Sequence, residues 1–424
     1  MTPEIKQRIE QICRGEVPEG YKKGKLGVVP EEWEETSFST LFTSTSDYTD
    51  DLEKYPLYSL TIEDGITPKT ERYERSHLVK KEDSYKIVRP NDYAYNPMNL
   101  RFGAVARHKG DMPVAVSGYY DIFTTVHESD LPFMDSFLTC GPMITYYNRV
   151  STGSLVEKQR VHFSQFLEFM LPLPSINERT KIAAILTTQD KVIELKEKRL
   201  AEKQRQKKYL MQQLLTGKKR LPGFSEEWKI KPLKKLTEKQ KKKNHGFQYR
   251  LVLSNSAQHG IVSQDQEFDK EIANEERIDG YYIVIPGAFV YNPRISVTAP
   301  CGPINVNETG ETGIMSPLYT VFTISSPQIS QDFLKYYFQS SCWYKYVKGV
   351  ANYGARHDRI SISDGDFFDM PIPLPTKEEQ NYIAKVLSAV DREIELLQQD
   401  IEQEKEKKKA LMQLLLTGIV RVKV

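Results

Sequence analysis

The chain contains almost the same eight residues twice, and this repetition limits how it can fold. The stretch "LMQQLLTG" ends at Gly217, and "LMQLLLTG" ends at Gly418, 201 residues later. Other matches occur in the same order at offsets of 195 to 201, among them "EEW" at 31 and 226, "YNP" at 95 and 291, and "PLP" at 172 and 373. Matches that keep their order along a chain indicate a tandem duplication, so each half should fold in the same way.

A long helix is predicted in the last part of each half. After each "PLP" comes a hydroxyl residue with a glutamate three positions later, Ser175 with Glu178 and Thr376 with Glu379, and both pairs are capping boxes that begin a helix. No Gly or Pro follows until the glycine of "LLTG", where a helix end is expected. Each helix should contain about 40 residues and extend for roughly 60 Å, which is too long for burial in one small domain.

The apolar pattern predicts that the two helices pair with each other. In the second helix, apolar residues recur at spacings of three and four, as in a helix seam: Ile383, Val386, Leu387, Val390, Ile394, Leu397 and Ile401. The first helix has a weaker seam, with Gln189 and Lys196 at matching positions. The stretches "EKQRQKK" and "EQEKEKKK" contain no seam residue, so the pair is expected to open there or to meet another protein.

The rest of each half should be a globular domain rich in strands, because runs such as "YKIVRP" and "YTVFTI" alternate with Gly, Pro, Asn and Asp. The predicted fold is therefore α+β: two tandem-duplicated mixed α/β domains separated by two long helices, which form an antiparallel coiled-coil spacer with a pseudo-two-fold axis. The expected segments are an N-terminal helix and linker (1–22), domain 1 (23–170), spacer helix 1 (171–218), domain 2 (219–371) and spacer helix 2 (372–424). A short helix from Pro3 to Arg14 is expected beside the C-terminal end, closing the repeat into a circle.

No catalytic residue, metal site or cofactor site is predicted. The four cysteines are scattered, and the histidines do not match between the halves. The "YNP" triplets lack the second proline and the aromatic residue of an amino-methyltransferase motif, and the acidic stretch "DYTDDLE" has no counterpart in the second half. Without an apolar run of eighteen residues or a secretory signal, we expect a cytoplasmic protein with no membrane contact.

Two basic loops at matching places favour nucleic-acid binding. The stretch "STGSLVEKQRVHF" from Ser151 and "KGVANYGARHDRIS" from Lys348 both precede the spacer helix and mix glycine with cationic residues. Arginine can bind a guanine edge through two hydrogen bonds, and Lys, Arg, Ser and Tyr bind phosphates. A surface salt bridge remains the alternative for each of these residues.

Taken together, these features resemble the DNA specificity subunit of type I restriction-modification systems. The resemblance covers essentially the whole chain, and its most specific parts are the helix starts "PLPSINERTKIAAIL" and "PLPTKEEQNYIAKVL", both "LLTG" endings and the "EEW" openings. It implies a non-catalytic subunit whose two target-recognition domains each bind half of a divided site on double-stranded DNA. It also implies two docked methyltransferase subunits, which carry the methyl donor, and restriction and motor subunits for cleavage.

The residues assigned to these roles follow from the loops, the "YNP" turns and the helix seams. The candidate DNA-binding residues are Arg101, Arg107, Lys158, Gln159, Arg160, Arg294, Tyr353, Arg356, His357 and Arg359. The candidate partner-binding residues are Ile182, Ile185, Ile193, Leu214, Ile383, Val386, Ile394 and Leu415. The tyrosines of the "YNP" turns are expected in the core. Because the domains differ outside the repeated motifs, an asymmetric two-part target with a fixed gap is expected.

Two alternatives stay open at this stage. The first is a non-catalytic coiled-coil interaction scaffold without DNA readout, which DNA binding that depends on the methyltransferase partner would exclude. The second is a fused nuclease with an unrecognised site, which would cleave DNA by itself in the presence of a metal.

Overall fold

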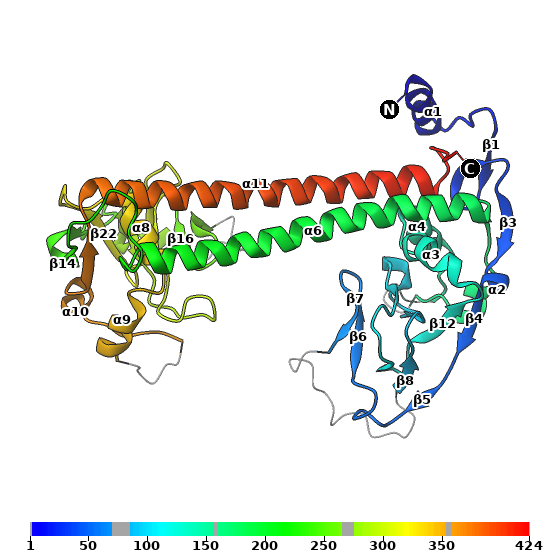
Figure 1. The fold of residues 1–424 in the computed structure, drawn as a ribbon, viewed down its shortest axis with the longest axis horizontal. Coiled ribbons are helices and arrows are strands. Elements are labelled where there is room, and N and C mark those ends of the chain that lie inside the picture. The colour runs from blue at the N-terminus through cyan, green and yellow to red at the C-terminus, as the bar shows by residue number, and fades with distance from the viewer. Residues whose placement is uncertain are drawn as a thin grey trace. The chain divides into compact units, whose positions relative to one another are not determined.

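The computed structural model describes residues 2–69, 85–153, 155, 159–264, 275–352 and 358–423. The chain forms two compact units: unit 1 combines Met1–Glu197 with Asp400–Val424, and unit 2 is Lys198–Gln399. Both borders fall inside the long helices α6 (Ile176–Leu214) and α11 (Lys377–Leu416), so each unit contains part of both helices. Figure 1 shows α6 in green and α11 in orange to red. Their 39 and 40 residues confirm the predicted lengths.

Both long helices begin at the predicted caps. The Oγ of Ser175 accepts a hydrogen bond from the backbone N–H of Glu178 at 3.3 Å, and Thr376 Oγ1 accepts one from Glu379 N–H at 3.3 Å. These bonds satisfy backbone donors of the first turn, which have no partner inside the helix. The two glutamate side chains bind elsewhere, as described below.

Both long helices end at the predicted glycines. Gly217 and Gly418 have φ angles of +69° and +70°, which glycine adopts without a steric penalty. At the end of α11, the N–H of Gly418 donates to Leu415 O at 3.2 Å, which is one of the two hydrogen bonds of the Schellman motif. A Cβ atom on Gly418 would lie 2.4 Å from Pro30 Cγ, so a larger residue at this position could not pack.

Unit 1 joins a mixed sheet domain to its parts of the two long helices. Its main sheet has the strand order β10–β9–β12–β4, and a second sheet has the order β11–β8–β5. The strands are β1 (Tyr21–Gly24), β2 (Gly27–Pro30), β3 (Glu34–Ser37), β4 (Phe42–Thr45), β5 (Tyr48–Thr49), β6 (Tyr58–Thr61), β7 (Gly65–Pro68), β8 (Tyr85–Val88), β9 (Tyr93–Tyr95), β10 (Val105–Arg107), β11 (Val114–Ser117), β12 (Asp121–Thr125) and β13 (Met170–Leu173). The shorter helices are α1 (Pro3–Cys13), α2 (Phe38–Leu41), α3 (Leu131–Phe137), α4 (Gly141–Val150), α5 (Phe163–Leu167) and the 3-10 turns η3 (Leu100–Phe102) and η4 (Glu128–Asp130).

Unit 2 repeats this arrangement. Its main sheet has the order β20–β19–β22–β15, which matches the first sheet of unit 1 strand for strand. The strands are β14 (Lys229–Pro232), β15 (Thr237–Lys239), β16 (Leu253–Ser256), β17 (Gly260–Ser263), β18 (Tyr282–Val284), β19 (Phe289–Tyr291), β20 (Ile304–Val306), β21 (Gly313–Met315), β22 (Thr320–Ile324) and β23 (Pro371–Leu374). The helices are α8 (Gln331–Gln339), α9 (Tyr344–Val350), α10 (Asp364–Phe368), η6 (Leu233–Lys235) and η7 (Glu275–Gly280).

Aromatic side chains fill the main core of each unit. In unit 1, Phe123 stacks on Tyr93 with ring centroids 5.2 Å apart, and Phe289 stacks on Phe322 at 5.3 Å in unit 2. Tyr95 and the matching Tyr291 are buried, which confirms the prediction that the "YNP" tyrosines belong to the core. The apolar ends of the long helices pack into the same cores, which anchors each helix end to a domain.

Polar residues hold the helices together where the seam of α6 is weak. Within unit 1, Gln189 donates to the Glu404 carboxylate at 2.6 Å, and Lys196 Nζ donates to Glu404 at 2.9 Å and to Asp400 at 2.8 Å. These hydrogen bonds lower the pKa of Glu404 to about 2, so its carboxylate stays charged near neutral pH. The two polar seam positions of α6 therefore pair with acidic groups on α11.

The expectation that the helices open at the charged stretches is wrong. In unit 2, Lys203 and Lys207 of "EKQRQKK" form ion pairs of 2.5 Å with Glu393 and Asp391. In unit 1, the stretch "EQEKEKKK" is joined to α6 by the ion pair of Glu404 with Lys196 and by those of Lys405 with Glu197 at 2.8 Å and Lys408 with Asp190 at 2.5 Å. In both units the residue numbers rise in one helix as they fall in the other, which confirms the antiparallel pairing within each unit.

The same buried ion pair fastens the start of one long helix to the end of the other in both units. In unit 1, Arg421 binds both oxygens of Glu178, with Nε–Oε1 at 2.6 Å and Nη2–Oε2 at 3.0 Å, and the Trp33 indole donates to Oε2 at 3.3 Å. Only 2% of the Glu178 side chain is exposed. This carboxylate thus joins the "PLP" helix start, the "EEW" tryptophan and the segment after "LLTG".

Unit 2 contains the same three-part contact. Arg220 binds Glu379 at 2.7 and 2.8 Å, and the Trp228 indole donates to Glu379 Oε2 at 3.0 Å. The carboxylate is again almost fully buried, at 1% exposure. The motifs repeated in the sequence therefore meet at one place in each unit.

The N-terminal helix lies against the segment that follows α11. The Arg8 guanidinium donates to Ile419 O at 2.5 Å, and the Tyr21 hydroxyl donates to Gly418 O at 2.8 Å. These contacts confirm the expected position of α1 beside the C-terminal end, although α1 contributes no buried residue. Unit 1 is thus closed by both ends of the sequence.

Among the described residues, no helix has an apolar stretch long enough to cross a membrane. The described side chains also contain no group of three or more His, Cys, Asp or Glu residues that could hold a metal ion.

We predict that Arg421→Ala lowers the free energy of unfolding of unit 1 by about 3 kcal/mol, because it leaves the buried Glu178 carboxylate without its cation. The matched change Arg220→Ala should destabilise unit 2 instead. Hydrogen exchange resolved by peptide would separate the two effects. Equal loss of protection in both units after either change would contradict the assignment of one ion pair to each unit.

Candidate nucleic-acid interface

In unit 1, the "YNP" turn and the first basic loop lie side by side. The backbone N–H of Val161 donates to Pro97 O at 3.1 Å, which ties the end of the loop to the turn. Close by, Arg101 Nη1 donates to the side-chain oxygen of Gln159 at 3.1 Å. Arg160 forms an isolated antiparallel bridge with Thr152 through the backbone. Three of the candidate DNA-binding residues of unit 1, Arg101, Gln159 and Arg160, therefore occupy one region.

In unit 2, the corresponding segments meet in the same way. Ile360 N–H donates to Pro293 O at 3.0 Å, which is the counterpart of the bond between Val161 and Pro97. The candidate residues Arg294 and Arg359 are partners in an isolated antiparallel bridge. These two arginines are distant in the sequence, but their backbones lie side by side in the fold.

Exposed apolar side chains accompany these arginines. The Arg101 guanidinium lies over the Phe102 ring, 4.4 Å from its centroid, and Phe102 is 49% exposed. Three residues after Arg294, Val297 is fully exposed. Each unit therefore presents cationic groups with an accessible apolar group, a combination that suits the charged backbone and the base edges of a nucleic acid.

Four candidate residues lie outside the described part of the chain: Lys158, Tyr353, Arg356 and His357. Their assignment to DNA binding stays a prediction.

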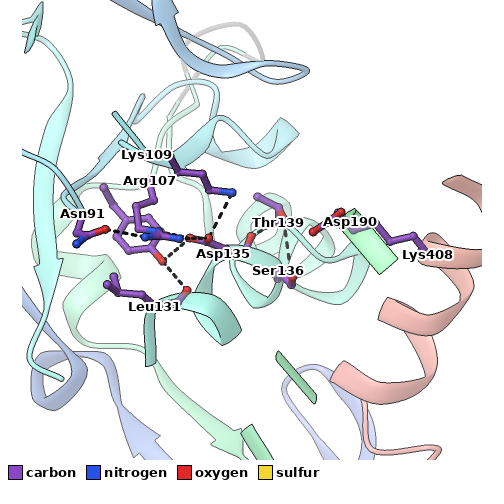
Figure 2. A network of polar contacts seen from close by, with 10 residues as sticks. Asn91, Arg107, Lys109, Leu131, Asp135, Ser136, Thr139, Asp190 and Lys408 are labelled. Carbon is purple, nitrogen blue, oxygen red and sulfur yellow. Dashed lines mark hydrogen bonds and ion pairs between the residues drawn. The ribbon is translucent and has the colours of Figure 1, made fainter. Parts of the chain in front are cut away.

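The remaining candidate, Arg107, takes part in an internal network (Figure 2). Its guanidinium binds Asp135 through Nε–Oδ1 at 2.9 Å and Nη2–Oδ2 at 2.7 Å, and its Nη1 donates to Asn91 Oδ1 at 2.7 Å. The Tyr93 hydroxyl also donates to Asp135, at 2.7 Å. Arg107 thus joins β10 to α3, and these contacts engage all three of its guanidinium nitrogens within unit 1.

Asp135 is the centre of this network, and the sequence analysis did not single it out. Burial alone would raise the pKa of its carboxyl group, but the hydrogen bond from Arg107 and the charge of Lys109 hold that pKa below its ordinary value. No repeated motif marks Asp135, because unit 2 has no matching acidic residue in the "QDFLKYYFQ" helix at the equivalent turn. Only the fold brings Asp135 to Arg107.

Most candidate partner-binding residues lie inside the units. Five are buried, so another protein could not reach them in the folded chain: Ile182, Ile193, Leu214, Ile383 and Leu415. Val386 packs against the core of unit 2, and Ile394 is half-buried. Ile185 is the accessible member of the set, at 39% exposure. The burial shows that the seam residues serve the chain's own core and helix pairing.

We predict that Asp135→Asn lowers the free energy of unfolding by about 3 kcal/mol near neutral pH, because Arg107 would lose its buried counter-ion. The control Lys109→Ala should cost less than about 1 kcal/mol, because Lys109 is largely exposed to solvent. Chemical denaturation of both variants checks this. Similar losses from the two changes would show that the Arg107 pair is not the main contact.

Comparisons with known proteins agree with this architecture. The family described as "Type I restriction modification DNA specificity domain" matches residues 225–406. A putative type I restriction enzyme MjaX specificity subunit of Methanocaldococcus jannaschii is 24% identical over 96% of this chain and 97% of its own length. The MjaVIII specificity subunit of the same organism is 26% identical over 61% of this chain and 64% of its own length.

A solved chain from a study of complex assembly and conformational transition of the type I R-M system has a similar fold. Its TM-score is 0.55 at 14% identity, with 92% of this chain and 99% of that chain covered. The matched family region includes the "EEW" opening and most of α11 in the second half, and the first half repeats the same motifs. In its duplicated motifs, in its fold and along almost the whole length of one relative, the chain is therefore similar to the specificity subunits of type I restriction-modification systems.

Proposed function

We propose that the chain selects the DNA sequence on which a type I restriction-modification complex acts, and that it reads an asymmetric two-part target. Domains 23–170 and 219–371 would each bind one half-site, and the helical segments 171–218 and 372–424 would connect them. The observation that carries this proposal is the meeting of the "YNP" turn with the basic segment in both units, through the same backbone hydrogen bond.

The side chains at these two places differ, which supports different half-sites. Unit 1 presents Arg101 beside Gln159, and unit 2 presents Arg294 beside Arg359. Arginine binds the O6 and N7 atoms of guanine, while glutamine binds the N6 and N7 atoms of adenine. Separate recognition of two half-sites requires a shared scaffold that presents different side chains.

The chain itself would carry out no catalysis and bind no cofactor. Two methyltransferase subunits would dock on the helical segments and carry the methyl donor, and restriction and motor subunits would join for cleavage. Among the described residues, Ile185 on α6 is an exposed apolar side chain on such a docking surface. The competing proposal, an interaction scaffold without DNA readout, has no observation of its own in its favour.

We predict that Arg101→Ala weakens binding of the methyltransferase complex to its target DNA by about tenfold to a hundredfold, the usual loss for one good base contact. Arg359→Ala should act on the other half-site. Fluorescence anisotropy with DNA altered in one half-site at a time would show which preference each variant loses. Lys109→Ala controls for the loss of one positive charge in unit 1. An effect of Lys109→Ala as large as that of Arg101→Ala would argue for unspecific charge attraction.

We predict that replacing residues 38–165 with the corresponding segment of another family member changes one half of the methylated motif and leaves the other half unchanged. A genome-wide map of methylated adenines, in cells with the original and the exchanged gene, provides the measurement. Deletion of the gene should remove the motif entirely. A change in both half-sites would contradict separate recognition, and a map unaffected by deletion, with the methyltransferase expressed, would favour the scaffold proposal.

A further inference from the structure

Unit 2 has an open apolar groove at the end of α6. The groove has a volume of about 620 Å³ and lies between the helix end, the β14–β23 pair and α9. Its apolar lining includes Leu215, Ile230, Tyr346, Val350 and Pro373. Ile230 is 73% exposed and lies beside the other apolar residues that line the groove.

The duplicated half shows which residues correspond to this groove in unit 1. Ile230 is paired with Pro373 across the β14–β23 ladder, and Glu35 is paired with Pro172 across the β3–β13 ladder. The helices α4 and α9 both end at a valine, so Arg149 corresponds to Gly349, one residue before that end. The two faces are therefore built from matching elements.

In unit 1, the turn of the β1–β2 hairpin covers the part of this face around Pro172, while Glu35 stays exposed. The Lys25 Nζ donates to Met170 O at 2.9 Å, and Arg149 Nη2 donates to Lys25 O at 2.8 Å. Leu26 packs against the core of unit 1. A Cβ atom on Gly24 would lie only 3.5 Å from Pro172 Cγ, so the hairpin is in close contact with the strand below it.

Among the described residues of unit 2, no hairpin matches the one that lies on this face in unit 1. The connection from α6 to β14 consists of residues 215–228, all of which the structure describes, and none of them forms a strand. The acidic Glu35 of unit 1 is replaced by Ile230, which makes the uncovered face more apolar than the covered one. Lys345 lines the groove one helical turn before Gly349, so a cation is available near the position of Arg149.

We propose that a docked methyltransferase subunit fills this groove with a tight turn that presents an aliphatic side chain. The aliphatic group contacts Ile230 and Pro373, as Leu26 packs against unit 1, and a backbone carbonyl of the turn accepts a hydrogen bond from Lys345, as Lys25 O accepts one from Arg149. The inference rests on the proposed function. The choice of partner follows from the place of the groove: Leu215 and Thr216, which line it, directly follow α6, the helix proposed for docking.

The two halves then differ in how they receive a partner. Unit 1 covers this face with its own hairpin, whereas unit 2 leaves it for another protein. Two copies of one methyltransferase subunit would therefore dock on the duplicated chain through unequal contacts, and the copy at unit 2 would have the additional one.

Cysteine alkylation in the assembled complex tests the proposal. The full-length variant Ile230→Cys, with Cys13→Ser to remove an exposed thiol, is treated with a maleimide alone and after assembly with the methyltransferase subunits. Mass spectrometry then gives the alkylation rate at each cysteine. The expected result is a decrease of at least tenfold at position 230 on assembly. The matched control Glu35→Cys, at the equivalent exposed position of unit 1, should show no change.

A second variant measures the contribution to assembly. Ile230→Asp should weaken the binding of one methyltransferase subunit about tenfold in native mass spectrometry and leave thermal unfolding unchanged, because the side chain is exposed. An unchanged alkylation rate at position 230 in the full methyltransferase complex would overturn the inference and leave the proposed function intact. Protection that appears only after a motor subunit is added would overturn the choice of partner. Failure to form any methyltransferase complex would overturn both the inference and the docking part of the proposed function.

Discussion

The buried contact between a glutamate, an arginine and a tryptophan is the interaction on which the rest of the structure depends. Glu178 and Glu379 stand at the helix starts, are at most 2% exposed, and each binds one guanidinium through two hydrogen bonds. A carboxylate in such a position is costly to bury unless its charge is neutralised and its oxygens are hydrogen-bonded. Each contact therefore forms only when the start of one long helix, the end of the other and the beginning of a domain come together.

The two units form this contact from different parts of the chain. In unit 2, Arg220 follows α6 directly and continues into the domain through Trp228. In unit 1, Arg421 comes from the segment after α11, while Trp33 comes from the N-terminal region. The same junction is thus formed from a continuous segment in one unit and from two chain ends in the other. The two chain ends thus take the place of the continuous segment at the junction of unit 1.

The scaffold and the exposed loops of the two units obey different constraints. The sheet order, the buried "YNP" tyrosines and the junctions are the same, because each is determined by packing against a buried neighbour. The groups beside the "YNP" turns differ, with Gln159 in unit 1 and Asp358 at the matching position of unit 2. Solvent-facing side chains make few internal contacts, so they can diverge with little effect on stability. The β1–β2 hairpin is a further difference of this kind, because it lies on this face in unit 1 and has no counterpart among the described residues of unit 2.

The sequence alone determined the duplication, both long helices with their starting and ending residues, the core position of the "YNP" tyrosines and the resemblance to specificity subunits, because these depend on local patterns of capping, periodicity and repeated motifs. Tertiary structure decided which polar groups meet: Glu178 with Arg421, Asp135 with Arg107, and Gln189 with Glu404. Their partners are 28 to 243 residues apart in the chain, so no local pattern indicates the pairing. For the same reason, the sequence alone suggests that Arg107 binds DNA and that the charged helix stretches separate. In the fold, each of these residues has an internal partner of opposite charge on a neighbouring element.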